Sequence, residues 1–163
     1  MTPPEVARAV KLRLASELAD DRASLLELAQ SVALLLEPAA DKQDEWMRPL
    51  ALAFQVERWY TAAEATLLRL LRVLDGDTPA GPNWHQDVLR AAAVAIDGGR
   101  PALLTRDALG EMQELLKFRH LARHGYEAAP EASRMTEHGR RVGRASQALT
   151  LSLAALDRWL RAS

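Results

Sequence analysis

The sequence predicts an all-α protein, an up-and-down antiparallel bundle of four long helices and one short helix. Alanine, leucine, arginine and glutamate dominate its 163 residues, and these side chains lose little rotamer freedom in a helix. Apolar residues recur at steps of three and four, and no segment alternates with period two over a useful length. Proline- and glycine-rich loops separate the helical segments, and short connections between long helices make neighbours antiparallel. The length predicts a single domain.

The first two predicted helices are both long. The first, near 4–37, begins at a pair of prolines and carries a less regular apolar stripe, which consists of Val10, Leu14, Leu18, Leu25, Leu28, Val32 and Leu35. The second, near 43–75, ends at a loop of Asp, Gly, Thr and Pro residues over 75–82. Its stripe is the most regular in the chain and consists of Val56, Tyr60, Ala63, Leu67, Leu70 and Leu74.

Three further helices are predicted after this loop. The short one lies near 84–96, with Asn83 as its N-cap. The next lies near 103–124 and ends before Gly125, a residue type common at helix C-caps. The last lies near 131–161, and its apolar stripe consists of Met135, Val142, Leu149, Leu153, Leu156 and Leu160.

The composition excludes several classes of protein. The chain has no cysteine, which excludes disulfides, thiolate metal sites, iron–sulfur clusters and cysteine nucleophiles. Its longest uncharged stretch, 145–156, is well short of the roughly 20 residues that a membrane helix needs. No apolar stretch precedes a small-residue cleavage site near the N-terminus, so no secretory signal is expected.

The charge is unevenly distributed, although the net charge is only −1. Residues 117–144 hold seven lysines or arginines and three acids, whereas the rest of the chain holds 14 basic and 19 acidic residues. A basic end of this kind can attract a polyanion. For Arg140, Arg141 and Arg144, however, the favoured interpretation is a solvated helix face.

Two arginines fall on the apolar side of the helix near 103–124. On a helical wheel, Arg119 and Arg123 each lie about 20° from Met112, the centre of the apolar stripe. Arginine is rarely buried unless it is paired or serves a site. Two non-functional alternatives would also explain these positions. Arg119 could pair with Glu57 or Glu64 on the neighbouring helix, or the apolar stripe could emerge from the core into solvent.

Two histidines share this helix end. His124 lies in the last turn, where the negative helix terminus stabilises its protonated form, and an imidazole exchanges protons near neutral pH. Arg119 and His124 are about 140° apart around one helix, so they converge better if two copies pack about a two-fold axis. His120 and His124 have the i, i+4 spacing of some zinc ligands, but no acid is suitably spaced to complete a metal site, and none is expected.

The arrangement Arg119-x4-His124-x-Tyr126 resembles the signature of the HepT-like toxins, a branch of the HEPN ribonucleases. The similarity is greatest over about 54–126, and the chain would then form one HepT-like domain over 1–163. Residues upstream of the signature also recur in similar order in that group: Trp59-Tyr60-Thr61 with Glu64, Trp84-His85, Arg100-Pro101 and Phe118-Arg119-His120.

The resemblance implies a HEPN-like bundle that dimerises, with the signatures of both copies at the interface, and RNA cleavage without a metal or other cofactor. His124 would activate the ribose 2′-hydroxyl or protonate the leaving oxygen, and Arg119 would hold the phosphate. His120 stands where the family commonly has another polar residue, often asparagine, and is expected to contact the RNA. Arg123 and Lys117 are additional expected phosphate contacts.

The resemblance also implies a partner, a minimal nucleotidyltransferase antitoxin that transfers AMP to the signature tyrosine, here Tyr126. Such a modification adds bulk and negative charge beside the catalytic pair. The resulting hypothesis is a cytoplasmic, homodimeric, toxin-type endoribonuclease. Two alternatives remain: a non-catalytic partner that binds substrate or nucleotide for a nucleotidyltransferase, and a plain interaction bundle in which Arg119 is a paired core residue.

Overall fold

The computed structural model describes residues 3–38, 41–124 and 130–162, and every regular element in these ranges is helical. The elements are α1 (Pro3–Leu36), α2 (Lys42–Leu74), α3 (Trp84–Ala92), α4 (Arg106–His124) and α5 (Ala132–Ala162). The predicted all-α fold with four long helices and one short helix is thus confirmed. Within the described ranges, no helix combines the length and apolar character needed to cross a membrane.

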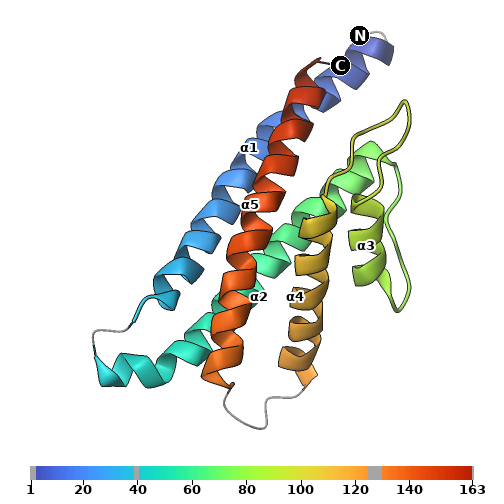
Figure 1. The fold of residues 1–163 in the computed structure, drawn as a ribbon. Helices are drawn as coiled ribbons and strands as arrows, with labels where there is room; N and C mark the ends of the chain where they lie inside the picture. Colours follow the sequence, from blue (N-terminus) through green and yellow to red (C-terminus); the bar gives the residue numbers. More distant parts are fainter. Residues whose placement is uncertain (1–2, 39–40, 125–129, 163) are drawn as a thin grey trace.

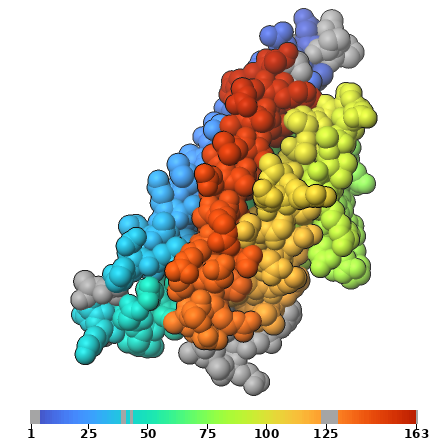
Figure 2. Space-filling view, in the orientation of Figure 1, coloured from blue at the N-terminus to red at the C-terminus, as the bar shows by residue number. Residues whose placement is uncertain are grey.

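The four long helices run alternately up and down (Figure 1). Helices α1 and α5 lie side by side and antiparallel along the length of the molecule, so the start of α1 and the end of α5 meet at one end. Helix α2 crosses behind α5 and contacts both α1 and α5, while α4 lies beside α5 (Figures 1 and 2). The short α3 packs on the outer side against α2 and α4.

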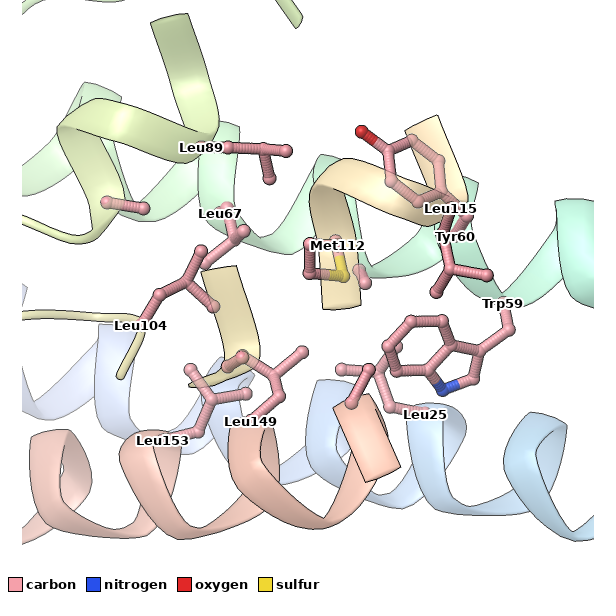
Figure 3. Close-up of a cluster of buried hydrophobic side chains, with 14 of the residues drawn as sticks. Leu25, Trp59, Tyr60, Leu67, Leu89, Leu104, Met112, Leu115, Leu149 and Leu153 are labelled. Carbon is pink, nitrogen blue, oxygen red and sulfur yellow. The ribbon is translucent and has the colours of Figure 1, made fainter. Parts of the chain in front are cut away.

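The core is formed by the stripes that the sequence predicts. On α2, five of the six stripe residues are at most 1% exposed, and all six of those on α5 are buried. On α1 the buried stripe begins at Leu14, because Val10 is 38% exposed. Side chains from all five helices converge in this core (Figure 3), among them Leu25, Trp59, Tyr60, Leu89, Met112, Leu115, Leu149 and Leu153.

A glycine permits the close approach of α5 to the other helices. A Cβ atom at Gly139 would lie 2.8 Å from Leu36 Cδ2 on α1 and 3.3 Å from Leu52 Cδ2 on α2. Both distances are shorter than ordinary carbon contacts. Gly139 therefore lets α5 contact the end of α1 and the start of α2 at the same level.

The connection between α3 and α4 differs from the prediction. Helix α3 ends at Ala92 rather than near 96, because the chain turns back at Ile96, whose N–H and C=O both bond to Arg100. Gly98, at a φ of +70°, makes this turn possible. Asn83 does stand at the N-cap of α3, but its side chain makes no capping hydrogen bond, and its carbonyl accepts instead.

Candidate functional site

Arg119 lies inside the bundle, on the face of α4 that packs against α2. It is 6% exposed, and its Nη1 donates to Glu64 Oε2 at 2.8 Å. Its guanidinium also lies 5.5 Å from the centre of the Tyr60 ring. The predicted position on the apolar stripe is thus confirmed, and so is Glu64 as one of the two acids proposed as its partner.

Glu64 is the centre of a buried polar cluster. One carboxylate oxygen, Oε2, accepts from Arg119, and the other, Oε1, lies 2.6 Å from Nδ1 of His85. The Tyr60 hydroxyl donates to the same Oε1 at 3.2 Å. Burial, and then the negative charge of Glu64, raise the pKa of Tyr60 far above its ordinary value, so this hydroxyl stays a donor. The carboxylate, 4% exposed, is therefore satisfied by donors from three helices.

His85 connects this cluster to the surface. A carboxylate only accepts, so the 2.6 Å contact assigns the proton to Nδ1 of the His85 ring. The ring stacks on Trp84 with centroids 3.6 Å apart, and its side chain is 19% exposed. The exposed His120 of α4 approaches the same ring edge-on at 5.8 Å. The cluster therefore extends from the buried Glu64 to an imidazole at the surface of α4.

Arg100 holds α3, and with it His85, in place. The Arg100 side chain is buried, and its Nε and Nη2 donate to the two carboxylate oxygens of Asp75, both at 2.6 Å. Its Nη groups also donate to the carbonyls of Ala91 and Val94 at the end of α3. Asp75 directly follows α2, so this arginine clamp joins the end of α3 to the end of α2.

The other predicted site residues are only partly described. Lys117 is exposed, and its Nζ lies 2.5 Å from Glu114 on the same helix. His124 ends α4, but its side chain and that of Arg123 lie outside the described residues, as does all of Tyr126. The roles expected of these three residues stay predictions. Among the described residues, no group of three or more His, Asp or Glu side chains has an arrangement that could hold a metal.

The basic end is less positive than the sequence count suggests. Arg141 and Arg144 pair with Glu111 of α4, at 2.9 and 2.7 Å, and Arg144 also pairs with Glu137 at 3.0 Å. The hydrogen bond from Arg144 lowers the pKa of Glu111. These arginines line a groove of about 590 Å³ between α4 and α5, which lie together on the face seen in Figure 2. Glu111 and Glu114 precede the counted segment, so the count overlooked the acids that face it.

The position of His85 beside Arg119 is the feature that spacing did not predict. Tyr60 and Glu64 are four residues apart on the α2 stripe, a signal that the sequence does contain. His85 is 21 residues from Glu64 and reaches it only because α3 docks on α2. The upstream residues of the family resemblance did include all three.

The chain matches the family of HepT-like proteins over residues 51–160, more than half of its length. No curated protein and no solved structure gave a match. The matched span contains every residue of the buried cluster and the whole of α3 and α4. The chain therefore belongs to the HepT-like family of the HEPN superfamily.

Proposed function

We propose that the protein is a toxin-type, metal-independent endoribonuclease that acts as a homodimer. HepT-like and other HEPN proteins are generally ribonucleases. The observation that carries the proposal is the family match across α4, with Arg119 of the signature beside the imidazole of His85, which the ring of His120 approaches edge-on. Imidazoles can exchange the protons and a guanidinium can stabilise the developing charge in RNA cleavage without a metal.

In this proposal His124 exchanges the proton and Arg119 stabilises the charge that develops on the phosphate. Nη1 of Arg119 is bonded to Glu64 and the guanidinium lies 5.5 Å from the centre of the Tyr60 ring, so the phosphate would bind the part of the guanidinium that these two residues leave open. Because Arg119 is only 6% exposed, it acts as a preorganised charge rather than as a mobile arm. A second copy of the chain completes the pocket.

The remaining surface residues would bind the RNA backbone. Lys117, two residues before Arg119, and Arg123, next to His124, supply positive charge, and His120 supplies a hydrogen-bond donor. The pair that Lys117 makes with Glu114 is exposed and therefore weak, so a phosphate can compete for the ammonium group. A minimal nucleotidyltransferase antitoxin would regulate the site by transferring AMP to Tyr126.

The test is cleavage of RNA by the purified chain in EDTA. We expect wild type to cleave, His124→Ala to lose at least about 100-fold in rate, and Arg119→Lys to be impaired while still folded. The matched control is Arg158→Ala, which removes an exposed cation on α5 and should leave cleavage unchanged. Equal cleavage by wild type and His124→Ala, or no cleavage by wild type, contradicts the proposal.

One observation favours a second candidate. The ion pair with Glu64 is the contact expected if Arg119 is a paired core residue, which is the plain interaction bundle. Calorimetric titration with ATP, with and without a partner transferase, distinguishes this bundle from a non-catalytic nucleotide-binding partner of a nucleotidyltransferase. A chain that neither cleaves RNA nor binds ATP supports the interaction bundle, and tight ATP binding without RNA cleavage supports the nucleotide-binding partner.

A further inference from the structure

The Glu64–His85 pair has the geometry of a carboxylate-oriented imidazole. Glu64 Oε1 lies 2.6 Å from Nδ1 of His85, and a carboxylate at that distance fixes both the tautomer and the orientation of the ring. The two nitrogens of an imidazole diverge, so Nε2 faces away from Glu64, and in the neutral ring with its proton on Nδ1 the lone pair lies on Nε2. Stacking on Trp84 at 3.6 Å restrains the ring further.

A purely structural role does not require this arrangement. Glu64 already receives hydrogen bonds from Arg119 and Tyr60, so His85 is its third donor. The His85 side chain is 19% exposed and reaches the surface beside His120. Its Nδ1 also lies 3.4 Å from Arg119 Nη1, which places the ring directly beside the guanidinium proposed to hold the phosphate.

We propose that His85 is the general base of RNA cleavage, with Glu64 as its positioning residue; this assignment rests on the proposed function. Nε2 of His85 takes the proton of the ribose 2′-hydroxyl while the 2′-oxygen forms a bond to phosphorus. The bond from phosphorus to the 5′-oxygen breaks, and that oxygen receives a proton from His124. The products are a 2′,3′-cyclic phosphate and a 5′-hydroxyl.

This division of roles follows from the contacts of the His85 imidazole. With Nδ1–H bonded to Glu64, neutral His85 has its free lone pair on Nε2, which is the state of a base. His124 of the signature, at the end of α4, is then left as the acid that protonates the leaving oxygen. After one cleavage His85 is protonated and His124 is neutral, and proton exchange with water restores both to their starting states.

The test compares His85→Asn with wild type. The asparagine amide can donate to Glu64 from near the position of Nδ1 but cannot accept a proton at the position of Nε2. We expect kcat/KM for RNA to fall at least about 100-fold and the acidic limb of its pH profile to disappear. The apparent Tm should stay within about 4 °C of wild type. His138→Asn, which alters another half-buried histidine outside the cluster, is the control and should cleave like wild type.

A second substrate distinguishes the general base of the reaction from the general acid. Uridine 3′-(4-nitrophenyl phosphate) has a leaving group that needs no proton, so it should restore much of the rate to His124→Ala but not to His85→Asn. Restoration of His85→Asn overturns the assignment of His85 as the base. RNA cleavage by His85→Asn at the wild-type rate also overturns this assignment. If wild type itself cleaves no RNA, the proposed function is wrong, and the assignment of His85 falls with it.

A measurement on the wild-type protein covers the case in which His85→Asn does not fold. The chain has four histidines, so their ring nitrogens can be resolved by two-bond ¹H–¹⁵N correlation spectra. We expect His85 to be the Nδ1–H tautomer when neutral, and Glu64→Gln to weaken that preference. A neutral His85 protonated on Nε2 overturns the proposal.

Discussion

Replacing Glu64 by alanine is expected to destabilise the protein strongly. The change leaves the Arg119 guanidinium buried without its partner, 2.8 Å from where the carboxylate was, in a site where the two side chains are 8% and 5% exposed. It also removes the acceptor of His85 and of the Tyr60 hydroxyl. Breaking a buried ion pair from one side costs about 3–5 kcal/mol. In a chain of this length that corresponds to a fall in Tm of roughly 6–20 °C.

The assay is urea or thermal unfolding followed by circular dichroism, with Asp157→Ala as the matched control. Asp157 pairs with Arg161 on α5 at 3.0 Å, but the arginine is 52% exposed, so losing this pair should cost only about 0.3–0.5 kcal/mol. The double variant Glu64→Leu with Arg119→Met removes both charges and should be more stable than Glu64→Ala. If Glu64→Ala and Asp157→Ala lose the same stability, the buried pair does not have the energetic role argued here.

Three further expectations concern stability. Burial, and then nearby arginines, lower the pKa of His138, so the unfolded chain binds this proton more readily than the folded protein does, and the free energy of unfolding falls as pH drops below about 6.5. His138→Leu should make the free energy of unfolding in urea depend less on pH between about 5.5 and 7.5. Gly143→Ala, in open space on α5, should raise stability by about 0.5–1 kcal/mol, whereas Gly139→Ala meets side chains of α1 and α2 and should gain less, as thermal melts of both would show. The hydrogen bond from Arg144 lowers the pKa of Glu111, so the ionised Glu111 stabilises the folded protein at neutral pH, and this contribution is lost as pH falls below about 4.5. The free energy of unfolding of Glu111→Gln, measured over the same acid range, should therefore fall less than that of wild type.

The long helices could be predicted because their signal is local. The stripe containing Val56, Leu67 and Leu70 repeats at helical spacing, and burial of that face needs no knowledge of what covers it. The end of α3 could not be predicted in the same way. It is determined by Arg100, whose partners are the carboxylate of Asp75 and carbonyls that the turn at 96–100 brings together.

The candidate site was also predictable only in part. The helical wheel predicted Arg119 on the apolar face of its helix, and the sequence left Glu57 and Glu64 as its possible partners on the neighbouring helix. The packing of α4 against α2 shows that the partner is Glu64. The contact with His85 depends on how a nine-residue helix docks, and no periodicity encodes that. The positive charge of the basic end was overestimated for a related reason. Glu111 of α4 pairs with Arg144 of the neighbouring α5 but lies outside the segment in which the charges were counted.

The arginine clamp at Arg100 has a consequence for the motions open to the molecule. A helix as short as α3 is not stable in isolation, yet Arg100 ties the carbonyl of Ala91 in its last turn to Asp75, which directly follows α2. These bonds oppose any opening of the C-terminal end of α3 that leaves the end of α2 in place. In hydrogen exchange, its amides should behave as part of the same cooperative unit as α2 and not as a loosely attached flap.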